Sequence, residues 1–136
     1  MKLITYTDGG SRGNPGPAAI GVVVKNAATH ENLSAFGRYI GHTTNNQAEY
    51  QALVAAMETA LTHGATEVHC FLDSELIVKQ MNREYRVRDV ALQPHFLKIW
   101  NMAATLKKCT FTHVRREKNT EADALVNQAL DARAIS

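Results

Sequence analysis

Five short runs rich in apolar residues predict five β-strands. They are residues 2–8, Ala18–Lys25, Leu33–Ile40, Glu67–Asp73 and Lys108–Val114. In the first run, apolar and polar residues alternate, which is the pattern of a strand with one buried face. The stretch Arg12–Pro17, between the first two runs, is so dense in Gly and Pro that regular structure is prevented, and we expect a rigid loop there.

Four further segments are predicted to be helices. The first runs from Thr44 to about Thr62, because Thr44 and Gln47 resemble a capping box and Gly64 ends the helix. Apolar residues recur on one face of this helix and of the last one. The other three helices are Ser74–Met81, Pro94–Leu106 and Thr120–Ala132.

The order of these elements, β-β-β-α-β-α-α-β-α, predicts an α/β fold in which helices pack on a mixed sheet. A helix separates the first three strands from Glu67–Asp73. We therefore expect Glu67–Asp73 to lie parallel to residues 2–8.

Composition narrows the class of protein. A length of 136 residues with 45% hydrophobic residues suits one domain with one core, and a net charge of +2 does not indicate a general nucleic-acid binder. The N-terminal stretch is too short and too polar for a signal peptide, and no segment reaches the length of a membrane span. We expect a cytoplasmic protein with no membrane contact and, by default, a monomer. Cys70 and Cys109 are interpreted as reduced, buried thiols, with a disulfide as the alternative.

The candidate chemistry starts with acids at strand ends. Asp8 and Asp73 each close an apolar strand run, and ligands bind at the carboxyl ends of parallel strands in α/β sheets. Taken singly, each is equally well explained as a turn residue. Two acids at the ends of strands that could be neighbours are less ordinary.

Two further acids lie near helix N-termini. Glu49 shares a helix face with Leu53 and Ala56, and an ionised carboxylate on a core-facing stripe is costly when it is unpaired. It either caps the helix from the edge of the stripe or faces a cation. Asp123 sits in the first turn of the last helix, where the helix dipole alone explains it.

Carboxylates that gather at one place repel one another and need a counter-charge. Ligand sets made only of oxygen select hard cations, Mg²⁺ or Mn²⁺. The sequence holds no HExxH, Cys-cluster or Walker-lysine pattern, so the common zinc and P-loop sites are excluded. Paired divalent ions are a recurrent solution for phosphodiester cleavage, and the residues favour a metal-assisted phosphodiesterase.

Four motifs resemble those of type 1 ribonuclease H, and the similarity covers nearly the whole chain. The motifs are Thr7-Asp8-Gly9-Gly10-Ser11-x-Gly13-Asn14-Pro15-Gly16-Pro17, Thr43-Thr44-Asn45-Asn46-Gln47-Ala48-Glu49, Asp73-Ser74 and Asn119-x-x-x-Asp123. The resemblance implies a ribonuclease H-like fold, a five-stranded mixed sheet with helices on both faces, formed by residues 1–136 as a single catalytic domain. It also implies a metal-dependent endoribonuclease that hydrolyses the RNA strand of RNA–DNA hybrids and leaves 5′-phosphate and 3′-hydroxyl ends.

The same resemblance implies roles for residues. The catalytic acids, and the ligands of two Mg²⁺ ions with Mn²⁺ as a substitute, would be Asp8, Glu49, Asp73 and Asp123. Gly13, Asn14 and Asn45 would lie in the minor groove of the hybrid beside the RNA 2′-hydroxyl groups, with Asn46 and Ser74 as further substrate contacts. For Asn14 and Asn45, turn and helix-cap roles are the alternative.

The chain departs from the best-known bacterial members in two places. Those members have a long, basic, Trp-rich insertion, whereas Arg83–Gln93 is short, with three Arg and no Trp. We therefore expect weaker hybrid binding that is more easily lost with salt. Those members also carry a loop His before the last acid. Here the loop has none, and Arg116 or Glu117 is expected to take its place, with His113 structural.

Two alternatives to hybrid-specific hydrolysis remain. One is a hybrid-binding module without catalysis, which would be expected to have lost one or more of the four acids. The other is a nuclease that also acts on double-stranded RNA.

Overall fold

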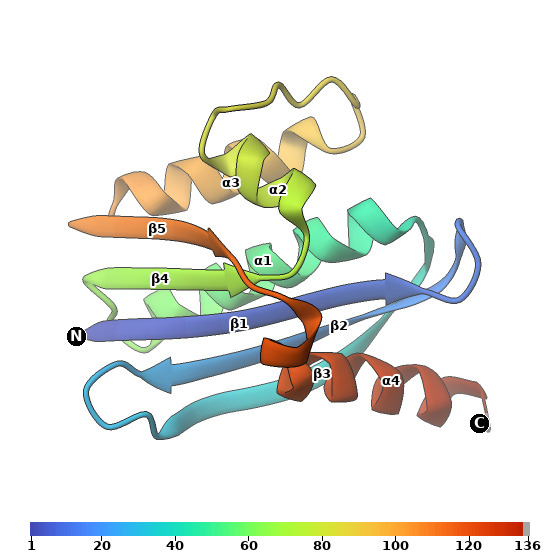
Figure 1. The fold of residues 1–136 in the computed structure, drawn as a ribbon, viewed down its shortest axis with the longest axis horizontal. Coiled ribbons are helices and arrows are strands. Elements are labelled where there is room, and N and C mark those ends of the chain that lie inside the picture. Colours follow the sequence, from blue (N-terminus) through green and yellow to red (C-terminus); the bar gives the residue numbers. More distant parts are fainter. Residues whose placement is uncertain (135–136) are drawn as a thin grey trace.

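The computed structural model describes residues 1–134, and it contains one five-stranded sheet in the order β3-β2-β1-β4-β5 (Figure 1). The strands are β1 Lys2–Ser11, β2 Gly16–Asn26, β3 Asn32–Thr43, β4 Glu67–Leu72 and β5 Lys108–His113. The helices are α1 Asn45–Thr62, α2 Glu75–Met81, α3 Gln93–Ala104 and α4 Thr120–Ala134, with a short 3₁₀ helix, η1 Arg116–Lys118. None of the helices among these residues is long and apolar enough to cross a membrane.

The central strand β1 has a different kind of neighbour on each side. It pairs antiparallel with β2 and parallel with β4, where Thr7 is the partner of Leu72. β5 then extends the sheet parallel to β4. The predicted parallel pairing of the first and fourth strands is confirmed. Because the two strands are parallel, their C-terminal ends lie at the same end of the sheet.

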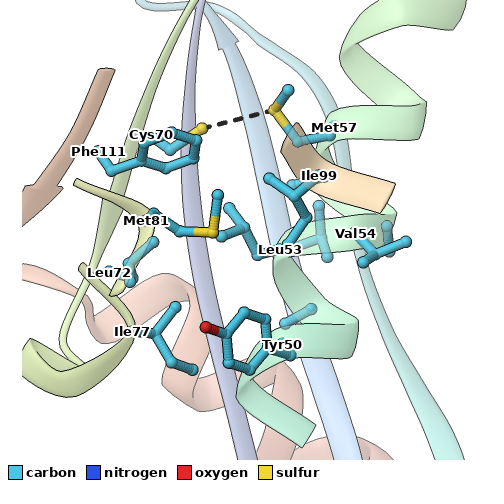
Figure 2. Packing of buried hydrophobic residues seen from close by; sticks show 14 of the residues in the cluster. Tyr50, Leu53, Val54, Met57, Cys70, Leu72, Ile77, Met81, Ile99 and Phe111 are labelled. Atoms are coloured by element: carbon cyan, nitrogen blue, oxygen red, sulfur yellow. Dashed lines mark hydrogen bonds between the residues drawn. The ribbon is translucent and has the colours of Figure 1, made fainter. Parts of the chain in front are cut away.

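Helices cover both faces of the sheet, as the resemblance implied (Figure 1). α1 packs on one face, with α3 beside it, and α4 lies on the opposite face over β2 and β3. The main core fills the α1 side, where Tyr50, Leu53 and Met57 meet strand residues such as Cys70 and Leu72 (Figure 2). Within it, the Tyr50 hydroxyl donates a 2.6 Å hydrogen bond to Gln80 Oε1, so the one buried phenol is satisfied.

Glycines in the sheet allow α4 to approach closely. A Cβ atom on Gly21 would overlap the carbonyl oxygen of Ala122, and one on Gly37 would overlap that of Leu125. At these two positions, the gap between strand and helix has room for a hydrogen atom but not for a larger side chain. The N-terminal part of α4 is therefore held directly against β2 and β3.

Several element boundaries differ from the predicted ones. β1 runs three residues beyond Asp8, because Gly9, Gly10 and Ser11 continue the antiparallel pairing with β2 after the parallel partner has ended. β4 ends at Leu72, so Asp73 lies in the link to α2. The 3₁₀ helix η1 was not predicted.

The predicted cap of α1 forms in part. Thr44 Oγ1 accepts a 3.2 Å hydrogen bond from the Gln47 backbone N–H. The Gln47 side chain does not return it, because its amide binds the carbonyl oxygen of Ala91 and the ring of His95 instead. Cys70 is buried and Cys109 is only partly buried, and both are free thiols.

Candidate active site

Three of the predicted acids meet at the end of the central strands. Asp8 comes from β1, Glu49 from the first turn of α1 and Asp73 from the residue after β4. One carboxylate oxygen of each lies within 4.8 Å of the others. Glu49 and Asp73 lie 41 and 65 positions after Asp8 in the sequence, and the fold brings the three acids into one cluster.

Gly9 holds two of these acids in place. Its backbone N–H lies 3.0 Å from Asp8 Oδ1 and 3.0 Å from Glu49 Oε1, and it donates to both. This contact needs a very close approach of β1 to α1, because a Cβ atom on Gly9 would overlap the backbone of Ala48 and Glu49. A glycine is therefore required at this position for steric reasons.

Asp73 carries a carboxylate oxygen that has no hydrogen-bond partner among the described residues. Its side chain is 11% exposed, and its Oδ2 atom is buried with no hydrogen-bond partner among residues 1–134. The nearest cation is Arg116, whose Nε atom is 4.0 Å away and whose side chain is 81% exposed. Such a long, solvated contact satisfies Asp73 weakly.

Asp123 approaches from the opposite face of the sheet. It lies in the first turn of α4, lines the same cleft and is close enough to Asp8 for their carboxyl groups to interact. Asn119 fixes the start of this helix. It is buried, its Nδ2 group donates to the backbone carbonyl oxygen of Thr7 at 2.8 Å, and its backbone carbonyl oxygen accepts from the Asp123 N–H at 3.1 Å.

The environment of Asp8 and Glu49 is unfavourable for ionised carboxylates. The pKa of Asp8 is raised to about 7, mainly by burial; a hydrogen bond with Glu49 opposes the rise, and the negative charges of Asp73 and Asp123 contribute to it. Burial also raises the pKa of Glu49 well above its usual value, and the charge of Asp8 adds to the effect. A cation in the cluster would relieve both costs.

The cluster forms the floor of an open cleft of about 600 Å³. The donor set consists of carboxylate oxygens, one of them unpaired, and the cleft gives access from solvent. These features fit a hard divalent cation and do not fit a soft one. The predicted side chains that line the cleft are Asp8, Asn45, Glu49, Asp73, Ser74, Arg116 and Asp123.

Asn14 and Asn45 both make structural hydrogen bonds, but neither is the N-cap of α1, which is Thr44. Asn45 Oδ1 accepts from the Ser11 N–H at 2.8 Å and from Ser11 Oγ at 3.1 Å. Asn14 Oδ1 accepts from the Asn45 N–H at 3.1 Å. These bonds tie the β1–β2 turn, which includes Gly13 at a φ of 96°, to the N-terminus of α1.

The remaining predicted residues differ in their positions. Ser74 caps α2, because its Oγ accepts from the Ile77 N–H at 3.4 Å, and it also faces the cleft. Asn46 and Glu117 are exposed and are not among the residues that line the cleft. Of the two candidates for the loop position, only Arg116 reaches the acids.

Sequence reasoning missed some residues of the cleft. Arg12 lines it and forms a 2.6 Å ion pair with Asp131 on α4, which connects the β1–β2 turn to the far wall. Val126, Asn127 and Leu130 of α4 complete that wall. The partners in this ion pair are 119 residues apart, and no local pattern in the sequence indicates it.

The chain is similar to known proteins over nearly its whole length. A family model described as reverse transcriptase-like matches residues 6–129. The crystal structure of ribonuclease H1 from the halophilic archaeon Halobacterium salinarum superimposes with a TM-score of 0.93 at 39% identity, covering 97% of this chain and 99% of that one. The chain belongs to the type 1 ribonuclease H family.

Two other proteins are similar to this chain over nearly all of its residues. LC11 ribonuclease H1, solved in complex with an RNA/DNA hybrid, has a TM-score of 0.91 at 45% identity and covers 98% of this chain and 99% of its own. A bifunctional protein of Mycobacterium tuberculosis is 40% identical over 136 residues, which is all of this chain. The chain spans only 37% of the length of that bifunctional protein.

Proposed function

We propose that this chain is an endoribonuclease that hydrolyses the RNA strand of RNA–DNA hybrids, with residues 1–136 acting as one catalytic domain. The observation that carries the proposal is the convergence of Asp8, Glu49 and Asp73, with their oxygens within 4.8 Å of one another, at the floor of an open cleft. The hybrid-bound structure of a relative at 45% identity supports the choice of substrate.

The metal ligands in this proposal are Asp8, Glu49, Asp73 and Asp123, which would hold two Mg²⁺ ions or, as a substitute, Mn²⁺. When bound, such ions supply activation of water and charge stabilisation of the leaving oxygen, which gives 5′-phosphate and 3′-hydroxyl ends. Gly9 fixes the orientation of Asp8 and Glu49 through its N–H. Asn119 fixes the helix that carries Asp123. Most of the rate enhancement would then come from carboxylates that the fold already holds in position before the substrate binds.

Selection of RNA is assigned to the asparagine network next to the acids. The Oδ1 atoms of Asn14 and Asn45 are used in internal hydrogen bonds, so their amide orientation is fixed and each Nδ2 group is left to donate outward. A donor held in this way suits the 2′-hydroxyl that distinguishes RNA from DNA. Gly13 in the same turn, Asn46 and Ser74 are proposed as further backbone or side-chain contacts.

Arg116 is proposed as the loop residue that assists the reaction. Its guanidinium is solvated and lies 4.0 Å from Asp73, so it can reach a phosphate at the cleft without first breaking a buried ion pair. Glu117, which is exposed in η1 outside the cleft, is the weaker candidate.

The test uses one end-labelled RNA strand, either annealed to DNA, annealed to RNA or left single, with Mg²⁺ and then with EDTA. The proposal predicts cutting of the RNA only in the hybrid, and only with the divalent ion. Equal cutting of the RNA duplex would instead support a double-strand ribonuclease. Tight hybrid binding with no cutting under Mg²⁺ or Mn²⁺ would support a binding module.

A further inference from the structure

Arg12 is a cation of the acidic cleft to which the proposed reaction gives no role. It lies in the turn between β1 and β2, beside the C-terminal half of α4 (Figure 1). Among residues 1–134, the cations that line this cleft are Arg12 and Arg116. Arg116 belongs to η1 and lies beside Asp73, so Arg12 supplies the positive charge of the cleft lining next to the end of α4.

The backbone of Arg12 is held in place on both sides. Its N–H donates to the carbonyl oxygen of Pro17 at 2.8 Å, and the N–H of the preceding Ser11 donates to Asn45 Oδ1 at 2.8 Å. A Cβ atom on Gly16 would overlap the carbonyl oxygen of Arg12, so the turn is closed tightly at this point. The side chain therefore starts from a fixed position at the cleft, and its guanidinium can change partner without movement of the backbone.

The present partner of the guanidinium is held weakly. Arg12 Nη2 lies 2.6 Å from Asp131 Oδ1, and the two side chains are 45% and 68% exposed. Exposed ion pairs of this kind contribute little to stability. The other guanidinium N–H groups have no hydrogen-bond partner among the described residues. A carboxylate held in this way can be exchanged for another anion at little cost.

We propose that Arg12 binds a backbone phosphate of the RNA–DNA hybrid, and that Asp131 is an internal competitor that holds the same guanidinium in the free chain. This inference rests on the proposed function, since it takes the hybrid as the substrate. On binding, the guanidinium exchanges the Asp131 carboxylate for phosphate oxygens, and no covalent bond or proton moves. Arg suits this exchange because its planar fork of donors matches a phosphate in two-point contact.

The alternative is that the ion pair only ties the β1–β2 turn to α4. A structural tie predicts that loss of Arg12 lowers the melting temperature and leaves hybrid binding unchanged. Phosphate binding predicts a change in affinity and in its dependence on salt, because each phosphate contact releases counterions from the nucleic acid. The two roles therefore differ in which measurement responds.

The test is the affinity for a labelled RNA–DNA hybrid, measured by fluorescence anisotropy with Mg²⁺ at several NaCl concentrations. Every chain carries Asp8→Asn so that the hybrid is not consumed, and cleavage by the chain with Asp8 intact is measured in parallel. Arg12→Gln should weaken binding by about tenfold at low salt, and should reduce the slope of log affinity against log salt by about 0.9. Arg12→Lys keeps the charge, so it should keep most of the slope and recover part of the affinity.

Asp131→Asn removes the competitor and should tighten hybrid binding by about two- to fivefold. This gain should vanish when Arg12→Gln is also present, because the competition acts through Arg12. Glu121→Gln is the matched control, since Glu121 is an exposed acid on the same helix, pairs with Lys25 at 3.1 Å and is not among the residues that line the acidic cleft. Its affinity should stay close to that of the parent chain.

Unchanged affinity and salt slope in Arg12→Gln, while the chain with Asp8 intact cuts the hybrid, would overturn this inference and leave the proposed function in place. An equal gain from Asp131→Asn with and without Arg12→Gln would also overturn it, because the carboxylate would then act by general repulsion. A chain that neither binds nor cuts the hybrid would overturn the proposed function and this inference with it.

Melting temperatures establish that each variant is folded. If Arg12→Gln does not fold, Asp131→Asn decides: an affinity no tighter than that of Glu121→Gln contradicts the exchange of a carboxylate for a phosphate.

Discussion

The side-chain amide of Asn119 donates a 2.8 Å hydrogen bond to the backbone carbonyl oxygen of Thr7, 112 residues earlier in the chain. Thr7 directly precedes Asp8 on β1. Asn119 lies four residues before Asp123, the acid of α4. One buried bond therefore sets the spacing between two elements that carry acids of the cleft.

Replacement of Asn119 by Ala is expected to lower both stability and activity. It leaves the Thr7 carbonyl without its buried donor, which costs about 1–3 kcal/mol in the free energy of unfolding. It also frees the start of α4, so kcat should fall more than the KM for the hybrid changes. Urea unfolding and steady-state kinetics measure the two effects. Asn127→Ala, at an exposed position on the same helix, is the control and should change stability little.

Adjacent glycines of β1 should respond differently to the same substitution. Gly9→Ala places a methyl group on the backbone of Ala48, so we expect severe destabilisation or failure to fold. Gly10→Ala places it 3.6 Å from Val126 Cγ1, an ordinary contact, and should be tolerated. Expression level and melting temperature compare the two variants. Equal stability of both would show that β1 and α1 are not in contact at Gly9.

Stability without divalent ions should fall as the pH rises. The folded-state pKa values of Asp8 and Glu49 are raised, so between about pH 4 and about pH 7 the folded chain binds more protons than the unfolded chain. The folded state is then penalised progressively as the pH rises through this window. Mg²⁺ should remove the penalty, because it neutralises the ionised cluster.

Urea midpoints at both ends of this window, with EDTA and with Mg²⁺, measure the effect of pH. The double variant Asp8→Asn with Glu49→Gln should show a flatter dependence in EDTA and little gain from Mg²⁺. A wild-type chain that gains stability with rising pH in EDTA would contradict the shared burial of these carboxyl groups.

Asn45 offers a way to separate its structural role from its proposed role in RNA selection. Asn45→Asp keeps an oxygen that accepts from Ser11 and removes the Nδ2 donor. We expect the variant to fold with near wild-type stability and to bind the hybrid more weakly. Fluorescence anisotropy with a labelled hybrid measures the affinity, and an affinity equal to that of the wild type would remove Asn45 from the substrate contacts.

The parts of the molecule that local patterns determine could be predicted from the sequence. Apolar runs gave the five strands, and Thr44 and Gly64 gave the limits of α1. The proximity of Asp8 and Asp73 followed from strand order, since the carboxyl ends of parallel neighbours lie at the same end of the sheet, whereas the place of Glu49 beside them was implied by the family resemblance.

The parts that depend on contacts between distant segments could not be predicted. The need for Gly9 arises from the backbone of α1, and the ion pair of Arg12 with Asp131 depends on where α4 ends. Glu117 and Asn46 carry suitable side chains, yet backbone geometry in η1 and in the first turn of α1 leaves them outside the cleft. Cys109 was predicted to be buried, but its strand lies at the edge of the sheet and leaves it partly exposed.

Catalysis at the acidic cleft is tested by single-turnover cleavage of an RNA–DNA hybrid by Asp8→Asn, with binding of the same hybrid measured in parallel. Glu58→Gln, at an exposed acid on α1 outside the cluster, is the matched control for the loss of one negative charge. Asp8→Asn is expected to cut about a thousandfold more slowly than the wild type and still to bind the hybrid, whereas Glu58→Gln should cut normally. A near wild-type rate for Asp8→Asn with Mg²⁺ would contradict the assignment of the acidic cleft as the catalytic centre.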